Sequence, residues 1–481
     1  MNHEESYRRI FDSRSADEMR MLAQVKRFLE CVIGDDEFRD ELKANLDDPR
    51  PVVAARGIDA DPRLMRPLFQ HGLTHLRFEN GSPDYPLAMA WDRYIGEMLE
   101  HRDRLAGLGS TAEAEPHFER WRQRQMRRVQ SECGDSASSI THPLVAFELS
   151  EGCSVGCWFC GISADKFRGA WPYDEKNAAL WKGVLAAMME RFGAGVQSGF
   201  LYWATDPMDN PDYARFLADF RDATGYLAQT TTAAPLKEVA RTREVLDLFW
   251  QHRSICNRFS ILNKKMLRRV HEEFTADELM PVELVLQNKE ALMSKAGAGR
   301  ARERREKLRS AGRDDRIALR DGDHQTIACV SGFLVSMPRG TVELVTPTRP
   351  SDRWPKGYKV LSTRFFDSVA SFERAMDSLL RDEIEVEPQA SSPARFRPDL
   401  DFEATESGFF LHSSRLRHRC NSMPFSARLG ELLEGGDRTY GSVLTTLVEE
   451  GEDLLLVRQA LEDLWESGVL CEGPDARSAA A

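Results

Sequence analysis

From about residue 143 the sequence alternates short β-type runs with longer stretches of helical periodicity. Such runs occur at 143–150, 198–204, 225–233, 257–262, 280–287 and 326–337. Helix candidates such as NAALWKGVLAAMMERF and TREVLDLFWQH lie between them. Strands that alternate with helices of this length form parallel sheets. The pattern therefore predicts an α/β fold, a partial barrel of six β/α units over residues 141–345, with its reactive groups at the carboxyl ends of the strands.

Other regions flank this predicted barrel. Residues 1–140 are expected to be helical, because Ser15 to Glu18 has the form of a capping box and apolar residues follow it at helical spacing. Residues 346–399 are interpreted as connector and linker. Residues 400–475 predict a strand, three helices and a final strand, which is a winged-helix outline. This last region carries thirteen acidic and six basic residues between positions 401 and 471, so we expect it to bind a peptide or protein and no nucleic acid.

The composition sets further limits on location and partners. The chain has 481 residues and a formal net charge of −12. Its start, MNHEESYRRI, has no apolar core of a secretory signal, and no apolar run is long enough to cross a membrane. We therefore expect a cytoplasmic, reducing environment, where cysteines serve as metal ligands or catalytic thiols rather than as disulfides. Residues 300–320 hold nine basic residues, a pattern typical of a solvated helix face.

The cysteines Cys153, Cys157 and Cys160 lie within eight residues, directly after the first predicted strand. A structural zinc site needs four ligands, commonly supplied as two C-x₂-C pairs. An iron–sulfur cube with three cysteine ligands leaves one iron open for a substrate or cofactor. Because a fourth ligand would have to come from far away in the chain, the three cysteines favour the cluster. A zinc-stabilised peptide-binding scaffold without catalysis is the alternative.

The segment CSVGCWFC, with Phe159 before its last cysteine, resembles the signature of the radical S-adenosylmethionine (SAM) superfamily. The resemblance implies one [4Fe–4S] cluster on the three cysteines, with SAM bound to the open iron. Many members carry Gly-Gly-Glu after the second strand, and this chain departs from them there. The SAM contacts that the resemblance implies in this sequence are Phe159, Trp203, Ala204, Thr205, Asp206, Thr231 and Ser260.

Several segments over residues 140–360 narrow the resemblance. FELSEGCSVGCWFCGISA, YWATDPMDNPDY, NRFSILNKKMLRRVHEEF, and IACVSGFLVSM followed by PTRPSDRWPKGY are similar to the radical SAM peptide epimerases, which mature ribosomally made peptides. The resemblance implies a precursor peptide as substrate, conversion of L-residues to D-residues, and an external electron donor such as flavodoxin or ferredoxin. It also implies that the C-terminal domain binds the leader of the peptide by strand addition.

Some alternatives stay open. Residues 25–68 look like the helical leader peptides of such pathways, or are a plain helical cap on the barrel. Thioether or carbon–carbon crosslinking is the other radical peptide modification to consider. Crosslinking families usually add auxiliary clusters on a cysteine-rich extension, whereas the remaining cysteines here are scattered singly, which favours one cluster.

Inversion of an α-carbon requires a hydrogen atom delivered to the face opposite the one that lost it. A thiol S–H bond is weak enough to supply that atom. Of the six cysteines outside the triad, only Cys329 falls within a predicted barrel strand, where alternation would direct it into the interior. We therefore expect Cys329 to be the hydrogen donor, with a buried structural cysteine as the alternative.

Overall fold

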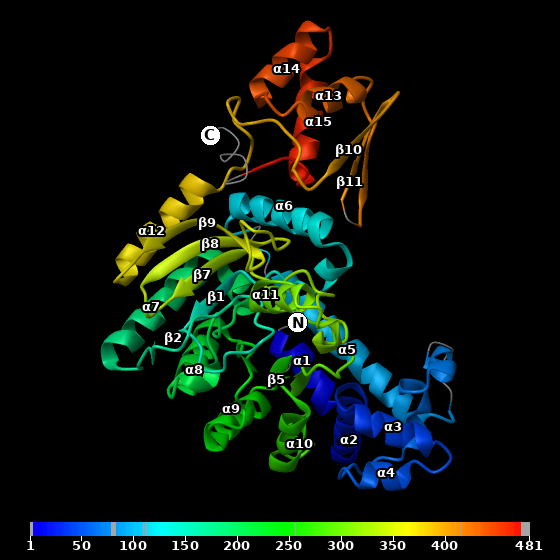
Figure 1. Ribbon diagram of the computed structural model, residues 1–481. Coiled ribbons are helices and arrows are strands. Elements are labelled where there is room, and N and C mark those ends of the chain that lie inside the picture. The colour runs from blue at the N-terminus through cyan, green and yellow to red at the C-terminus, as the bar shows by residue number, and fades with distance from the viewer. Residues whose placement is uncertain are drawn as a thin grey trace.

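Helices make up the N-terminal region of the computed structural model, which describes residues 3–77, 83–108, 110, 113–254, 256–413 and 415–472 (Figure 1). The capping box is confirmed, since the Ser15 Oγ accepts from the Glu18 amide at 3.2 Å and the Glu18 carboxylate accepts from the Ser15 amide at 2.9 Å. Phe28 and Phe38 pack in a separate apolar core of this region. The elements are α1 (His3–Asp12), α2 (Ala16–Gly34), α3 (Asp36–Ala44), α4 (Arg50–Ala54), η1 (Pro62–Leu68), η2 (His71–Arg77), α5 (Pro86–Leu108), α6 (Pro116–Cys133) and η3 (Gly134–Ser139).

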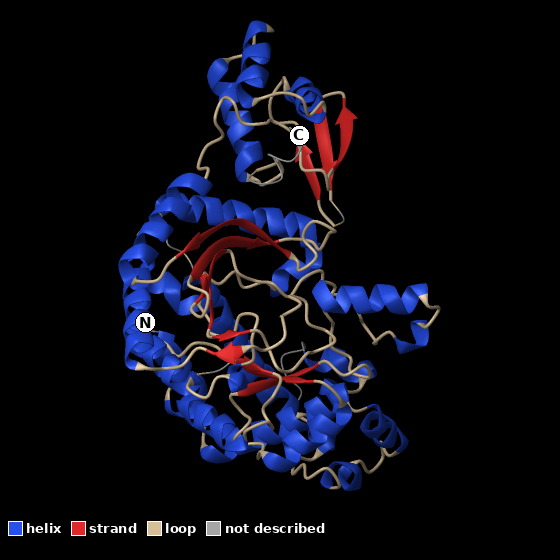
Figure 2. Ribbon diagram, turned by 60° about the vertical axis from the view of Figure 1, so that its left-hand side comes forward, coloured by secondary structure: helices blue, strands red, loops and turns tan. Residues whose placement is uncertain are grey.

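The central body contains two sheets. Strands β4 (Thr231–Thr232), β5 (Asn257–Ile261) and β6 (Val282–Leu286) form a parallel sheet. The second sheet has the order β1-β7-β8-β9, in which β1 (Val145–Glu148) and β7 (Gly332–Ser336) are parallel and β8 (Thr341–Pro347) and β9 (Tyr358–Phe365) are antiparallel. Parallel bridges from Phe200 to both Ala146 and Gln229 join the two sheets into one arc. Figure 2 shows the strands curving around an interior that loops fill.

This mixed α/β arrangement differs from the predicted six-unit barrel. The second predicted strand is reduced to the bridges at Phe200, and the sixth, predicted at 326–337, begins only at Gly332. The sixth strand also pairs with β1 and does not follow β6. A Cβ at Gly332 would lie 2.1 Å from the Leu144 carbonyl oxygen, so the absence of a side chain permits this close pairing. In the part of the chain that the structure describes, the strands form an open arc and not a closed barrel.

Helices cover the outer face of the arc. They are α7 (Glu175–Phe192), α8 (Tyr213–Thr224), α9 (Val239–Gln251), α10 (Lys264–Glu273) and α12 (Val369–Glu383). The Phe147 ring from β1 meets the Trp181 ring from α7 edge-on, with centroids 4.8 Å apart, in the largest apolar core. Residues 346–399, interpreted as a connector, in fact hold β9 and α12, and α12 packs in this core. The remaining short elements here are β2 (Ser150–Glu151), β3 (Gly169–Ala170), η4 (Gly193–Ser198), η5 (Pro207–Asp209), α11 (Gly299–Ser310) and η6 (Asp314–Arg316).

The C-terminal domain has its own core. An antiparallel sheet of β10 (Asp401–Thr405), β11 (Gly408–His412) and β12 (Arg417–Cys420) precedes α13 (Ser426–Glu434), α14 (Tyr440–Glu449) and α15 (Leu454–Glu466). The predicted final strand is a single bridge between Leu470 and Phe396. The domain is held against α6, where the Arg124 guanidinium lies 4.4 Å from the centre of the Trp465 ring. Within the described residues, no helix is both long and apolar enough to cross a bilayer.

Candidate functional site

The three clustered cysteines lie on a loop at the carboxyl end of β1. The short strands β2 and β3 pair across the base of this loop. Gly152, at φ 77°, sits where a Cβ would be 2.3 Å from the Lys166 carbonyl oxygen, so the chain returns very close to its own start. The Cys153 amide then donates to the Asp165 carbonyl at 2.9 Å. These contacts hold Cys153 at the strand end, as the sequence predicts.

The thiols of this loop are close enough to repel one another as anions. Burial raises the pKa of Cys153 to about 11. Burial, with the nearby thiols of Cys153 and Cys160, raises the pKa of Cys157 to about 12. Hydrogen bonds from the backbone amides of Val155 and Gly156 act against burial and lower the pKa of Cys153. The Ala164 amide lies 3.4 Å from the Cys160 sulfur. Without a bound cation, burial and mutual repulsion therefore disfavour the thiolate forms of Cys153 and Cys157.

The triad can be compared with the ligand arrangements of two kinds of metal site. Within the described ranges, no three His, Cys, Asp or Glu side chains are placed to hold a metal ion. The ligands of one zinc ion converge on a single point. In an iron–sulfur cube each thiolate binds a different iron, so the sulfurs lie further apart. Amides directed at two of the sulfurs also suit a cluster, because hydrogen bonds to cluster sulfurs tune such centres.

Helix α11 fixes the back of the cysteine loop. Arg300 donates from Nη1 to the Cys157 carbonyl at 2.9 Å and from Nη2 to the Ala164 carbonyl at 2.7 Å. Its backbone amide donates to the Cys160 carbonyl at 3.0 Å. A Cβ on Gly299 would lie 2.2 Å from the Gly161 carbonyl oxygen. The start of α11 and the loop therefore form one rigid unit.

The segment after Phe200 contains two adjacent polar residues, Thr205 and Asp206, and their side chains differ in hydrogen bonding. Ala204 has a φ of 55°, a left-handed conformation that costs a residue with a Cβ about 1–2 kcal/mol. The adjacent Thr205 Oγ1 is buried without any hydrogen-bond partner among the described residues. A buried hydroxyl of this kind is expected to have a partner, so a ligand group at Thr205 fits the structure. Trp203 is buried beside them in the interior cluster.

Asp206, also predicted as a SAM contact, is fully engaged within the protein. Its carboxylate accepts hydrogen bonds from the Ala233 amide at 2.7 Å, the Thr232 hydroxyl at 2.8 Å and the Met208 amide at 2.9 Å. Burial raises the pKa of Asp206 to about 6, although these hydrogen bonds favour the ionised form. Asp206 therefore braces η5 against the end of β4.

The other predicted SAM contacts lie at the β4–β5 side of the arc. Phe159 is buried against Leu262, which follows β5, and against Cys157. Ser260 is buried in β5. The Thr231 hydroxyl, at the end of β4, accepts a hydrogen bond from the Gln229 amide at 2.9 Å. The fold therefore brings these residues to the same side of the cysteine loop, with Thr231 already hydrogen bonded.

Cys329 precedes β7 by three residues, so its placement within a strand was wrong. It nevertheless packs in the interior cluster that contains Ala146, Phe200 and Trp203. Two residues earlier, the Ile327 side chain approaches the cysteine loop so closely that a Cβ on Gly161 would lie 2.5 Å from its Cγ1. Burial raises the pKa of Cys329 to about 11. The residue therefore stays a neutral thiol at neutral pH and keeps its S–H bond.

A cavity of about 220 Å³ lies between the cysteine loop and the carboxyl ends of β1 and β7. At its wall, the Arg339 guanidinium pairs with the Glu148 carboxylate at 2.6 Å, and the Ser336 hydroxyl donates to the same carboxylate. Burial raises the pKa of Glu148. The cavity is smaller than the roughly 300–1,000 Å³ that hold whole drug-sized ligands. It therefore has room for about one amino-acid residue.

Sequence reasoning missed two acidic residues at this site, Asp209 and Glu148. Asp209 accepts hydrogen bonds from the Ser154 amide at 2.8 Å and from Lys237 at 2.6 Å, and so ties the cysteine loop to η5. No local sequence pattern indicates this link, because its partners lie far apart in the chain. Glu148, by contrast, is an acidic residue inside the apolar run PLVAFELS. A carboxylate at the end of an otherwise apolar strand could have identified Glu148 as a candidate site residue from the sequence.

Comparisons with known proteins give the family of this chain. Residues 394–468 match the family model of the protein y4wI C-terminal domain. The chain is 43% identical over 476 residues to the uncharacterized protein y4wI of Sinorhizobium fredii (strain NBRC 101917 / NGR234), with 99% of this chain and 92% of that protein covered. The crystal structure of BtrN in complex with AdoMet and 2-DOIA has a TM-score of 0.29 at 12% identity, over 50% of this chain and 83% of that one. With an identity of 43% over nearly its whole length, the chain belongs to the y4wI family.

Proposed function

We propose that this protein is a radical SAM enzyme that converts L-residues to D-residues in a ribosomally made precursor peptide. The observation that carries the proposal is the position of a thiol, Cys329, in the interior cluster beside the loop that bears Cys153, Cys157 and Cys160. Cys153, Cys157 and Cys160 of the cysteine loop would hold one [4Fe–4S] cluster, and Phe159 and Thr205 would contact bound SAM. When bound, the cluster and SAM supply a 5′-deoxyadenosyl radical that removes an α-hydrogen.

Cys329 completes the inversion by returning a hydrogen atom. Its S–H bond breaks and a new Cα–H bond forms on the face opposite the one that lost hydrogen. The resulting thiyl radical takes one electron from an external one-electron reductant and one proton from solvent, which restores the thiol. Burial raises the pKa of Cys329 further above neutral pH, so the hydrogen stays on sulfur. A thiolate would have no hydrogen atom to give.

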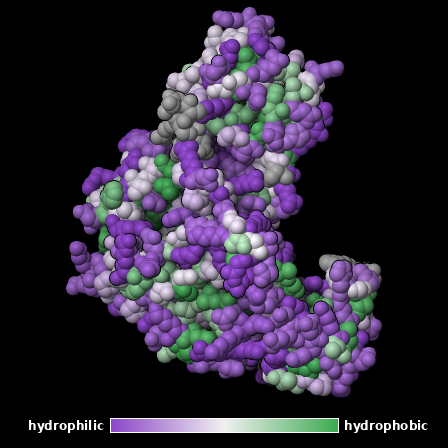
Figure 3. All heavy atoms as spheres, viewed as in Figure 1, coloured by the Kyte–Doolittle hydropathy of each residue, from purple (hydrophilic) through white to green (hydrophobic). Residues whose placement is uncertain are grey.

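The residue-sized cavity supports a peptide substrate. One residue enters beside Glu148, while the rest of the peptide lies outside. The C-terminal domain offers a second contact for such a chain, since Leu454, Leu455 and Leu456 at the start of α15 are 50%, 72% and 46% exposed. Consecutive exposed leucines are unusual on a soluble surface unless something binds there. Figure 3 shows further hydrophobic surface on this domain, near β10 and β11. We assign the leader of the precursor peptide to this domain.

The test uses protein purified and reconstituted without oxygen, SAM, a chemical reductant and the precursor peptides encoded beside the gene, in deuterated water. Wild type should form 5′-deoxyadenosine and a D-residue that carries one deuteron. Cys329→Ala should still form 5′-deoxyadenosine but return no D-residue. The matched control is Cys256→Ala, because Cys256 also precedes a strand but packs against the N-terminal helices; it should invert normally. D-residues from Cys329→Ala at the normal rate would refute the donor role, and a colourless, zinc-containing wild type would refute the enzyme.

A further inference from the structure

Helix α11 joins the cysteine loop to an exposed basic surface. Only Gly299 and Ala301 of this helix are buried, so no apolar face of α11 packs on the body. Residues 299–316 carry eight basic and four acidic residues, in a chain whose formal net charge is −12. A helix that is polar on all sides needs a reason other than core packing. The surface around α11 is mainly hydrophilic (Figure 3).

Two arginine side chains of the helix contact the loop. Arg300 binds the Cys157 and Ala164 carbonyls, as described. One turn further, the Arg304 guanidinium lies 4.5 Å from the centre of the Trp158 ring. Trp158 is half-buried and stands between Cys157 and Phe159 in the loop. The basic helix therefore extends directly from the edge of the thiol site toward solvent.

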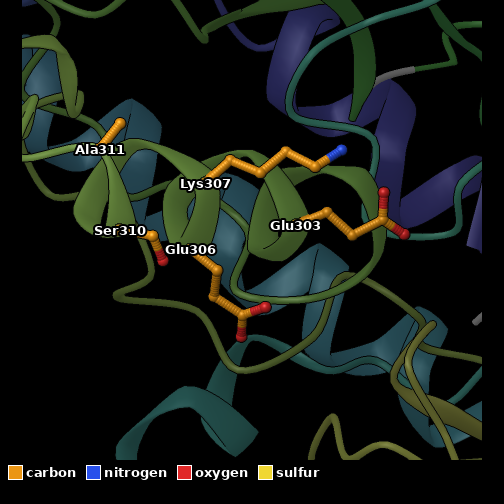
Figure 4. Close-up of a pocket in the computed structure, with 5 residues that line it drawn as sticks. All are labelled: Glu303, Glu306, Lys307, Ser310 and Ala311. Carbon is orange, nitrogen blue, oxygen red and sulfur yellow. The ribbon is translucent and has the colours of Figure 1, made fainter.

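The distal half of α11 is where the unpaired charge lies. Lys307, Arg309 and Arg313 are exposed and make no ion pair or side-chain hydrogen bond with any residue in the described part of the chain. Figure 4 shows the Lys307 side chain extended along the helix toward the turn that carries Glu303. The hollow there is open and is lined only by α11 and the residue that follows it, by Glu303, Glu306, Lys307, Ser310 and Ala311. It is a surface for a large partner rather than a cavity for a small ligand.

Resting on the proposed function, we infer that this basic surface, residues 300–313 of α11 and its C-terminal turn, docks an acidic one-electron carrier protein that reduces the cluster. One electron leaves the carrier and enters the cluster, and no atom is transferred. Lys307 lies about 10 Å along the helix from Arg300, at 1.5 Å per residue, so a carrier seated on the helix lies close to the loop. The positive surface attracts an acidic carrier to this face, whereas the net negative charge of the whole chain repels it elsewhere.

The experiment compares three forms of the full chain. The test variant carries Lys307→Glu, Arg309→Glu and Arg313→Glu. The control carries Arg20→Glu, Lys43→Glu and Arg381→Glu, which have side chains 61%, 73% and 71% exposed and lie on other elements. The net charge of both variants is therefore the same. Each form is supplied with SAM and either dithionite or a reduced acidic flavodoxin, and 5′-deoxyadenosine is measured at low and high salt.

With flavodoxin at low salt, the test variant should be slower than wild type by about tenfold or more, and high salt should remove most of the difference. With dithionite, all three forms should be equal. Two results overturn the inference: a test variant no slower than the control with flavodoxin, or an equal loss with dithionite, which would mean that the substitutions disturb the cysteine loop itself.

Binding of oxidised flavodoxin, measured separately by calorimetry, keeps the docking surface independent of the chemistry. It should weaken about tenfold in the test variant and hold in the control. If wild type makes no 5′-deoxyadenosine even with dithionite, the proposed function fails. The calorimetric binding measurement still tests the docking surface in that case. Equal binding by all three forms refutes the docking surface, whatever the outcome of the chemistry.

Discussion

The adjacent residues Thr205 and Asp206 should respond in opposite ways to substitution. Asp206→Asn replaces one carboxylate oxygen by an NH₂ group that faces existing donors, of which the Ala233 amide at 2.7 Å is the nearest. A buried donor left without an acceptor costs about 1–3 kcal/mol, and a hydrogen bond to a charged group contributes about 1.5–3 kcal/mol. We therefore expect a loss of about 2–3 kcal/mol in the free energy of unfolding at pH 7. Thr205→Val removes a buried hydroxyl that has no partner and should leave stability unchanged or raise it by about 1 kcal/mol.

The stability difference for Asp206 should also depend on pH. Its pKa is about 6 in the fold, raised from an ordinary value of 3.8 by burial. A raised acid pKa means that the folded state binds the proton more tightly, so this contribution is fully present below pH 4 and is lost as the pH rises through 6. Between pH 5 and pH 7 the loss is about 1.4 kcal/mol. Asparagine does not titrate, so the advantage of wild type over Asp206→Asn should be larger at pH 5 than at pH 7.

The assays are urea unfolding of the cluster-free chain, followed by tryptophan fluorescence at both pH values, and SAM affinity of the reconstituted chain. Thr205→Val should weaken SAM binding by about tenfold, which corresponds to one hydrogen bond of about 1.4 kcal/mol. The control is Thr224→Val, because the Thr224 hydroxyl is hydrogen bonded to the Phe220 carbonyl at 2.8 Å; it should lose stability and keep SAM. The reasoning is refuted if Asp206→Asn shows the same stability gap at both pH values, or if Thr205→Val binds SAM like wild type.

Two further predictions concern the cluster and the peptide. Replacing Cys153, Cys157 and Cys160 together by Ala should abolish the visible absorbance of the reconstituted cluster and 5′-deoxyadenosine formation; a full cluster in that variant would contradict the assignment. Leu455→Asp, at a side chain 72% exposed, should weaken leader-peptide binding about tenfold with little change in stability, since truncating an apolar anchor costs about 1.4 kcal/mol or more. Leu319→Asp is its control, because Leu319 is also exposed, at 52%, but lies outside the C-terminal domain, and equal weakening by both variants would contradict a leader site on α15.

The parts of the fold that could be predicted from sequence are those set by local pattern. The capping box at Ser15 needs only residues three apart. The position of Cys153 after β1 follows from one apolar run and the cysteines behind it. Strand order has no such local signal. The run that contains Cys329 gives no indication of whether it pairs beyond β6 or beside β1, because both positions bury the same apolar side chains.

The same distinction between local patterns and contacts formed only on folding explains which features of the site could be predicted. The sequence shows that Thr205 and Asp206 are polar and adjacent, but their roles depend on donors at Met208, Thr232 and Ala233, which meet Asp206 only after η5 and β4 have folded together. The residue-sized cavity beside Glu148 also depends on strand order. Ser336 and Arg339 reach Glu148 because β7 lies next to β1.

The pairing of β7 with β1 also determines what Cys329 can do. Had the sixth strand followed β6, the segment before it would lie on the far side of the arc, away from Gly161 and Trp203. With β7 beside β1, that segment crosses the interior before the strand begins, and Ile327 touches the cysteine loop. Cys329 thus reaches the interior from a loop and not by strand alternation. A thiol held there on a connecting segment is positioned by Gly332, whose close approach to Leu144 allows β7 to pair where it does. Gly332→Ala should therefore impair D-residue formation more than SAM cleavage, because it displaces the donor segment while leaving the three loop thiols in place.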